Sequence, residues 1–251
     1  MNFRRPSLAA AACVASLLVL IAGCDKDKKG VVPPAELVDL KPTLAVQKLW
    51  DTGVGGGGEK LRLALGLALD RGVLYTAARD GEVIALDPAS GRAKWSQDTK
   101  ADLAAGPGVG ASLVAVGTSD GKVIALDVAS GKVLWQASVS SEVLSAPLVT
   151  GDRVIVRSVD GRVHALDALT GKSQWTGEEP VPKLSLRGTA PPVLAKDNVI
   201  AGFDSGKVIA FALATGDIVW QAQVTTPGGR SELARLADVD SAVQVDGNDG
   251  F

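Results

Sequence analysis

A segment that ends in tryptophan recurs along this chain at intervals of about forty residues, and this repeat limits the available folds more than any other feature. The four copies are DGEVIALDPASGRAKW (80–95), DGKVIALDVASGKVLW (120–135), DGRVHALDALTGKSQW (160–175) and SGKVIAFALATGDIVW (205–220). Trp50 stands one interval before the first copy, so every tryptophan of the chain belongs to the series. Repeats of this length are typical of stacked four-stranded units, the blades of a β-propeller.

Each copy contains the turn signals of two β-hairpins. In the second copy, Asp120 and Gly121 separate two short β-branched runs, which is a strong hairpin signal because glycine accepts a positive φ without steric cost. Asp127 then opens a second turn, in which Gly131 is expected in the left-handed region. The strand after this turn ends on Trp135, whose flat indole and N–H donor suit a seam between two sheets. The structural positions of the repeat are therefore Gly91, Gly131, Gly171 and Gly216 with Trp95, Trp135, Trp175 and Trp220.

These repeats predict an all-β chain built from four-stranded antiparallel blades. Full units are expected at 61–95, 96–135, 136–175 and 184–220, with a fifth beginning at Gln221. Thr43–Trp50 is expected to form an additional outer strand ahead of the first unit. One four-stranded sheet cannot bury both of its faces, so each unit needs a neighbour on either side. Because propellers usually have about 4–8 blades, we interpret residues 43–251 as a partial, shortened propeller.

The N-terminus has the composition of a bacterial lipoprotein signal peptide. Two arginines at 4–5 precede an apolar run at 8–22, which has signal-peptide rather than membrane-spanning length. Small residues then precede Cys24, as in a bacterial lipobox, so residues 1–23 are expected to be removed and Cys24 to carry palmitate as the new N-terminus. An ordinary secretory signal with an incidental cysteine is the alternative reading.

The stretch after this cysteine has the composition of a flexible tether. Residues 24–42 are charged and then proline-rich, without the repeat period, so we expect an extended connection between lipid and folded body. Asp25 follows the cysteine, and in enteric bacteria an aspartate there tends to hold a lipoprotein at the inner membrane. The expected location is the periplasmic face of the outer membrane, with inner-membrane retention as the alternative.

The polar residues argue against several classes of function. The formal net charge is −2 and no basic stripe is present, so nucleic acid is not an expected partner. His164 is the single histidine and stands where other copies have Ile84 and Ile124, which predicts a half-buried strand residue. We therefore expect no metal site and no Ser-His-Asp site.

The aspartates recur with the repeat as turn residues do, so no catalytic residue and no cofactor are expected. Gly55–Gly58 is expected to be a flexible loop rather than a phosphate cradle, because no helix follows it.

The repeat motif resembles that of a known group of propellers. ALDPASGRAKW, ALDVASGKVLW and ALDALTGKSQW are similar to the A-x-D-x-x-x-G-x-x-x-W motif of quinoprotein-type repeats. Quinone-dependent dehydrogenases and non-catalytic propellers share this motif, so it indicates the fold alone. Two further stretches, PVPKLSLRGTAPPV (180–193) and GRSELARLADVDSAVQV (229–245), resemble loops of the BamB family, the lipoprotein subunits of the outer-membrane β-barrel assembly machinery. Together with the lipobox and ELVDLKPTLAVQKLW (36–50), the resemblance covers nearly all of the chain after residue 23.

The BamB resemblance implies a scaffold in a family of eight-bladed propellers. Such a scaffold docks on the POTRA domains of BamA, joins the other subunits of the machinery, assists the folding and insertion of outer-membrane proteins, and has unfolded outer-membrane proteins as further partners. A quinone-dependent dehydrogenase-like enzyme and a periplasmic adaptor with another partner are the alternative functions.

The docking residues that the resemblance implies lie in the two loops. They are Leu184, Leu186, Arg187, Asp238 and Asp240. Leucines beside an arginine offer an apolar anchor with a multidentate donor, as interface hot spots do. The two aspartates can face one way in an extended segment, and there they can pair with a partner cation or orient the arginine. The alternative places the leucines inside a blade and the aspartates in turns.

Overall fold

The structure is a computed structural model, and it describes residues 34–39, 41, 43–58, 61, 63–188, 190–228, 230–231, 233, 236–246 and 249–250. The chain divides into the units Met1–Gln47 and Lys48–Phe251, and the fold below is that of Lys48–Phe251. Its regular elements, within the described residues, are β-strands. The predicted all-β class is therefore confirmed.

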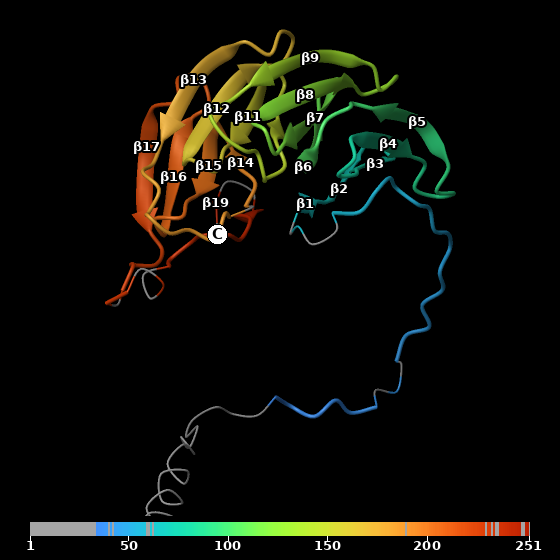
Figure 1. Ribbon diagram of the computed structural model, residues 1–251, viewed down its shortest axis with the longest axis horizontal. Helices are drawn as coiled ribbons and strands as arrows, with labels where there is room; N and C mark the ends of the chain where they lie inside the picture. Colours follow the sequence, from blue (N-terminus) through green and yellow to red (C-terminus); the bar gives the residue numbers. More distant parts are fainter. Residues whose placement is uncertain are drawn as a thin grey trace, which may run out of the picture. The chain divides into compact units, whose positions relative to one another are not determined.

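Four sheets follow one another along the chain, and each contains four antiparallel strands that pair in chain order (Figure 1). The first blade comprises β2 (Leu67–Asp70), β3 (Val73–Ala77), β4 (Glu82–Leu86) and β5 (Ala93–Asp98). The second comprises β6 (Leu103–Gly110), β7 (Leu113–Thr118), β8 (Lys122–Asp127) and β9 (Val133–Ser138). The third comprises β10 (Leu148–Val149), β11 (Arg153–Arg157), β12 (Arg162–Asp167) and β13 (Ser173–Glu178). The fourth comprises β14 (Val193–Ala195), β15 (Asn198–Gly202), β16 (Lys207–Ala212) and β17 (Ile218–Gln223). This is the predicted partial propeller.

The strands depart from the predicted units in a few places. β1 (Ala64–Leu65) pairs in parallel with β6 and so joins the second blade, although the sequence placed it in the first unit. After the fourth blade, β18 (Val245–Asp246) and β19 (Asp249–Gly250) form a short hairpin. The expectation of a strand at Thr43–Trp50 is wrong, since these residues carry no strand. A strand needs a partner for its ladder, and the described strands pair only with one another.

Each tryptophan at an inner seam packs on a turn of the following blade. The indole N–H of Trp175 donates to the carbonyl of Leu213 at 2.9 Å. Beneath the ring lies Gly216, with a φ of +77°, and a Cβ there would stand 2.6 Å from ring carbon Cε3. Bonds of 2.9–3.0 Å likewise join Trp50 to Pro88, Trp95 to Val128 and Trp135 to Ala168. Each seam thus combines an indole with a turn in which only glycine fits.

The apolar cores lie between neighbouring blades. Successive residues of a strand point to opposite faces, so one strand supplies two cores. On β11, Val154 and Val156 pack in the core shared with the second blade, and Ile155 packs in the core shared with the fourth. Because the third blade buries its two faces against different neighbours, its stability depends on both of them.

The turn aspartates of the repeat have the local role that their spacing predicted. Asp127 Oδ1 accepts the backbone N–H of Ser130 at 2.8 Å and its hydroxyl at 2.6 Å. The hydroxyl bond, followed by the backbone bond, lowers the pKa of Asp127 below its ordinary value. Asp87 and Asp167 make the same bonds in the first and third blades. These carboxylates therefore serve the turns of the fold.

Candidate partner-binding site

Leu184, Leu186 and Arg187 lie on the connection between the third and fourth blades, residues 179–192. This connection is longer than those at 99–102 and 139–147, which join the earlier blades. The side chain of Leu186 is 64% exposed and that of Arg187 57%, and Leu184 is exposed as well. The leucines therefore stand outside the blades rather than packing within one.

Asp238 and Asp240 hold the backbone of this connection from a segment about fifty residues further along the chain. Asp238 Oδ2 accepts the N–H of Leu186 at 2.7 Å, and Asp240 Oδ1 accepts the N–H of Ala190 at 3.1 Å. Both carboxylates face the connection, as their spacing in an extended segment allows. Each of these two bonds thus joins the 236–246 segment to the connection.

The environment of Asp238 disfavours its ionised form. Burial raises the pKa of Asp238 above its ordinary value, the bond from the Leu186 N–H opposes that rise, and the nearby carboxylates of Asp204 and Asp240 add to it. Its second oxygen, Oδ1, is buried without a hydrogen-bond partner among the described residues. Asp238 thus supports the backbone of the connection through Oδ2.

The guanidinium of Arg187 pairs with Glu142, which belongs to the connection between the second and third blades. Both side chains are partly exposed, and ion pairs of this kind contribute little to stability. A carboxylate of a binding partner can therefore replace Glu142 at small cost. The sequence analysis missed Glu142, because nothing in a single sequence links residues in two different inter-blade connections.

Three of the five predicted residues line one cavity of about 590 Å³: Leu186, Arg187 and Asp240. Its apolar lining is completed by Leu61, Leu63 and Leu144, and its polar lining by Arg79, Ser119 and Glu142. Leu184 and Asp238 are not part of this lining. A lining that mixes leucines with charged side chains suits an inserted apolar side chain flanked by polar groups.

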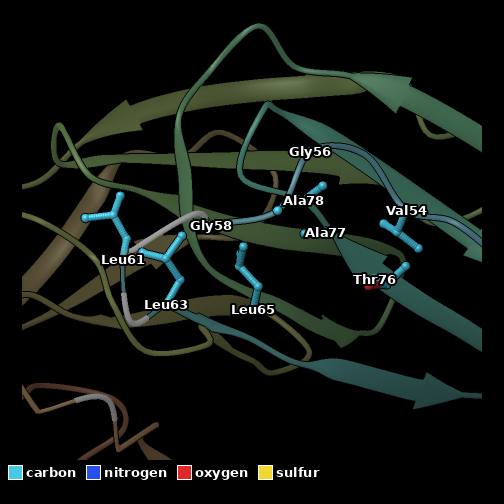
Figure 2. Close-up of a pocket in the computed structure, with 10 residues that line it drawn as sticks. Val54, Gly56, Gly58, Leu61, Leu63, Leu65, Thr76, Ala77 and Ala78 are labelled. Carbon is cyan, nitrogen blue, oxygen red and sulfur yellow. The ribbon is translucent and has the colours of Figure 1, made fainter.

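A smaller pocket of about 270 Å³ shares Leu61 and Leu63 with this cavity. Figure 2 shows those two side chains with Leu65 on one stretch of chain, near Gly56 and Gly58. The backbone N–H of Gly56 donates to the Asp80 carboxylate at 2.6 Å, and that of Gly55 donates to the Glu82 carboxylate at 2.9 Å. Carboxylates thus occupy the donors that a phosphate would require.

His164 lies buried in β12 rather than half-buried as predicted. Its Nε2 is 3.1 Å from the hydroxyls of both Ser140 and Ser158, and its Nδ1 is 3.4 Å from the hydroxyl of Thr176. Burial lowers the pKa of His164 below its ordinary value. Ser158 donates to Asp160 at 2.5 Å, so the carboxylate accepts from the serine, whereas Nδ1 of the histidine faces Thr176. This order differs from that of a Ser-His-Asp relay.

Cys24 and the predicted signal peptide lie outside the described residues. Within the ranges that the structure describes, no cluster of three or more His, Cys, Asp or Glu side chains is arranged to hold a metal ion. A search of the same ranges finds no helix with the length and hydropathy needed to span a membrane.

Comparison with known proteins supports the resemblance of the two loops. A family model described as "Outer membrane protein assembly factor BamB" matches residues 47–104 and 79–250. The curated protein of that name from Pseudomonas aeruginosa is 50% identical over 237 residues, covering 94% of this chain and 62% of the relative. The chain thus spans about three fifths of the length of the curated relatives that it matches.

Solved structures give the same result at the level of the fold. The crystal structure of BamB from Moraxella catarrhalis has a TM-score of 0.68 and 30% identity, and the match covers 74% of this chain and 57% of that one. A europium-containing methanol dehydrogenase has a TM-score of 0.53 at 20% identity, covering 64% of this chain and 41% of that one. The second likeness shows the propeller fold alone.

Proposed function

This chain belongs to the BamB family of outer membrane protein assembly factors, and on that premise we propose that it is a non-catalytic scaffold lipoprotein of the outer-membrane β-barrel assembly complex. It binds the POTRA domains of BamA and, with the other subunits, assists the folding and insertion of outer-membrane proteins. Unfolded outer-membrane proteins are its further partners.

The observation that carries this proposal is the way in which Leu186 and Arg187 are presented. Their side chains are exposed, whereas the backbone of their loop is bonded to Asp238 and Asp240. Exposed apolar and guanidinium groups on a pre-organised backbone lose little conformational freedom on binding, which favours affinity. The cavity beside them offers room for an apolar side chain of the partner.

Binding to purified POTRA domains of BamA tests this surface. We expect Leu186→Ala and Arg187→Ala each to weaken binding by about 2 kcal/mol, as truncation of a hot-spot residue does. Leu169→Ala and Arg92→Ala are matched controls, because both residues are exposed in hairpin turns, Leu169 between β12 and β13 and Arg92 between β4 and β5, outside the connection. The measurement is the equilibrium dissociation constant of the full chain by calorimetry or interferometry.

Undiminished binding by both loop variants removes the residue assignment. Equal losses in the loop variants and the controls point to a non-specific attraction. Absence of binding by the unaltered chain overturns the proposed partner itself.

The membrane attachment is the second part of the proposal. Residues 1–23 are a lipoprotein signal peptide, Cys24 is lipidated, residues 24–42 are a tether and residues 43–251 are the propeller body, which lies at the periplasmic face of the outer membrane. Cys24→Ser should abolish incorporation of labelled palmitate and release the chain from membranes. Separation of inner and outer membranes on a density gradient then locates the anchor, and inner-membrane recovery of the unaltered chain that Asp25→Ser reverses would contradict the assigned membrane.

A further inference from the structure

Arg157, at the end of β11, breaks the repeat at a position where the other blades have small residues. It pairs in register with Val163 on the next strand. The residues with the equivalent pairing in the other blades are Ala77, Gly117 and Gly202. A long cation therefore replaces a hydrogen or a methyl group in one of the four repeats, which the turn and packing requirements of a blade do not explain.

The guanidinium of Arg157 is buried and joins two elements. It is 3% exposed, as is its ion-pair partner Asp204, and Nη2 lies 2.5 Å from Asp204 Oδ1. Its other terminal nitrogen, Nη1, donates to the carbonyl of Gly188 at 3.0 Å. The guanidinium also lies over the ring of Phe203, 5.6 Å from the ring centre. Arg157 thus bonds the fourth blade through one nitrogen and the inter-blade connection through the other.

The carbonyl of Gly188 completes a set of three inward backbone bonds in the connection. Leu186 bonds to Asp238, Gly188 to Arg157 and Ala190 to Asp240. Between the first two, Arg187 has a φ of +58°, a left-handed conformation that costs free energy in a residue with a side chain. Such a conformation persists only when the surrounding bonds enforce it. The bonds on both sides of Arg187 turn its side chain and that of Leu186 outward.

We propose that Arg157, paired with Asp204, is a positioning residue for the partner-binding loop, fixing the outward arrangement of Leu186 and Arg187. This inference rests on the proposed function for its consequence in binding, but the loop geometry itself can be measured without a partner.

If the pair only stabilised the fold, its removal would leave the exchange of the loop amides unchanged in a folded variant, so the test needs a variant that keeps the fold. Replacing a buried ion pair by apolar residues of similar volume is often neutral for stability, whereas removing one partner leaves a costly buried charge. The double variant Arg157→Met/Asp204→Val therefore keeps the fold while it removes the bond to Gly188. Valine suits the second site, because Val159 stands at the equivalent place in the turn of the third blade.

Hydrogen exchange of the full chain measures the loop directly. In the double variant we expect the amides of Leu186 and Ala190 to exchange at least about 10-fold faster, because they lose the anchor between them. Core amides such as that of Ile200 should keep their protection. Arg157→Lys retains the charge but not the planar fork that reaches two acceptors, so its loop amides should lie between those of the wild type and the double variant. Arg92→Met is the control, since Arg92 is exposed in the turn between β4 and β5 of the first blade.

Binding to the POTRA domains is measured on the same variants. The double variant should bind about 10-fold more weakly than the unaltered chain, and Arg92→Met should bind equally well. If the unaltered chain does not bind, the proposed function fails, and the exchange experiment still decides the positioning role. Wild-type exchange at Leu186 and Ala190 in a folded double variant overturns the inference. If the double variant loses core protection, the test rests on Arg157→Lys. Exchange and binding equal to those of the wild type in Arg157→Lys would then overturn the inference.

Discussion

Trp175 and Trp220 hold the same position in two successive blades, yet their surroundings are opposite. Trp175 lies in a seam, is 9% exposed and donates its N–H to Leu213 of the fourth blade. Trp220 is 42% exposed, and within the described residues no turn accepts its N–H. Two further apolar side chains of its strand are also exposed, Ile218 and Val219. The repeat motif thus supplies one half of a seam, and the stabilisation comes only when a neighbouring turn supplies the other half.

The largest test of this comparison is truncation of the two indoles. Trp175→Ala should lower the free energy of unfolding by about 3–5 kcal/mol, because it empties a buried site and removes a seam bond. Trp220→Ala should cost at most about 1 kcal/mol, since its ring is partly solvated already. Urea unfolding of both variants measures the two values, and equal losses would break the comparison.

A smaller effect separates the indole from the turn beneath it. Gly216→Ala should destabilise by about 2–3 kcal/mol, because the added Cβ meets the Trp175 ring at 2.6 Å and the residue must keep a positive φ. Gly72→Ala is the control: its φ is +72°, but nothing lies within 4 Å of the added Cβ, so only backbone strain of about 1 kcal/mol remains. A cost at Gly216 no greater than that at Gly72 would mean that the ring moves aside freely.

Most of the fold could be predicted from the sequence because the residues of the repeat act through local contacts. Trp135, Gly131 and Asp127 each have a local reason, namely the seam, the left-handed turn and the turn bond, and the copies repeat that reason. The expected strand at Thr43–Trp50 failed for the opposite reason. A strand requires a neighbour for its ladder, and local sequence does not say whether one is present.

The candidate site was harder to predict, because its contacts join residues far apart in the chain. The motif resemblance gave Leu186 and Arg187, but not that Asp238 would bond the backbone of Leu186. Arg157 was missed, although the sequence held a signal for it. In the aligned copies, a charged residue at the end of β11 stands where the other blades have alanine or glycine, and such an exception within a repeat indicates a specific contact.

His164 gives the converse of the tryptophan comparison, with the same environment but a different residue. It pairs across its ladder with Thr176, at the position that Ile84, Ile124 and Ile209 hold in the other blades. Burial lowers its pKa in the folded protein, while the unfolded chain keeps a value near about 6.5. Below that pH the unfolded state binds more protons, so the folded state should lose stability as the pH falls from about 7 towards 5.

The smallest expected effect follows from restoring the residue of the other copies. His164→Ile removes the titrating group, so its free energy of unfolding should fall less than that of the wild type between pH 8 and pH 5. The carboxylates titrate in both proteins, so the difference between the two urea-unfolding series isolates the histidine. At pH 8 the variant should differ only modestly, because Ser158 still donates to Asp160 after its contact with the imidazole is lost. Parallel pH profiles would mean that the buried imidazole accepts a proton as readily as a solvated one. The environment of a repeat position would then not set the chemistry of its residue, as the contrast between Trp175 and Trp220 implies that it does.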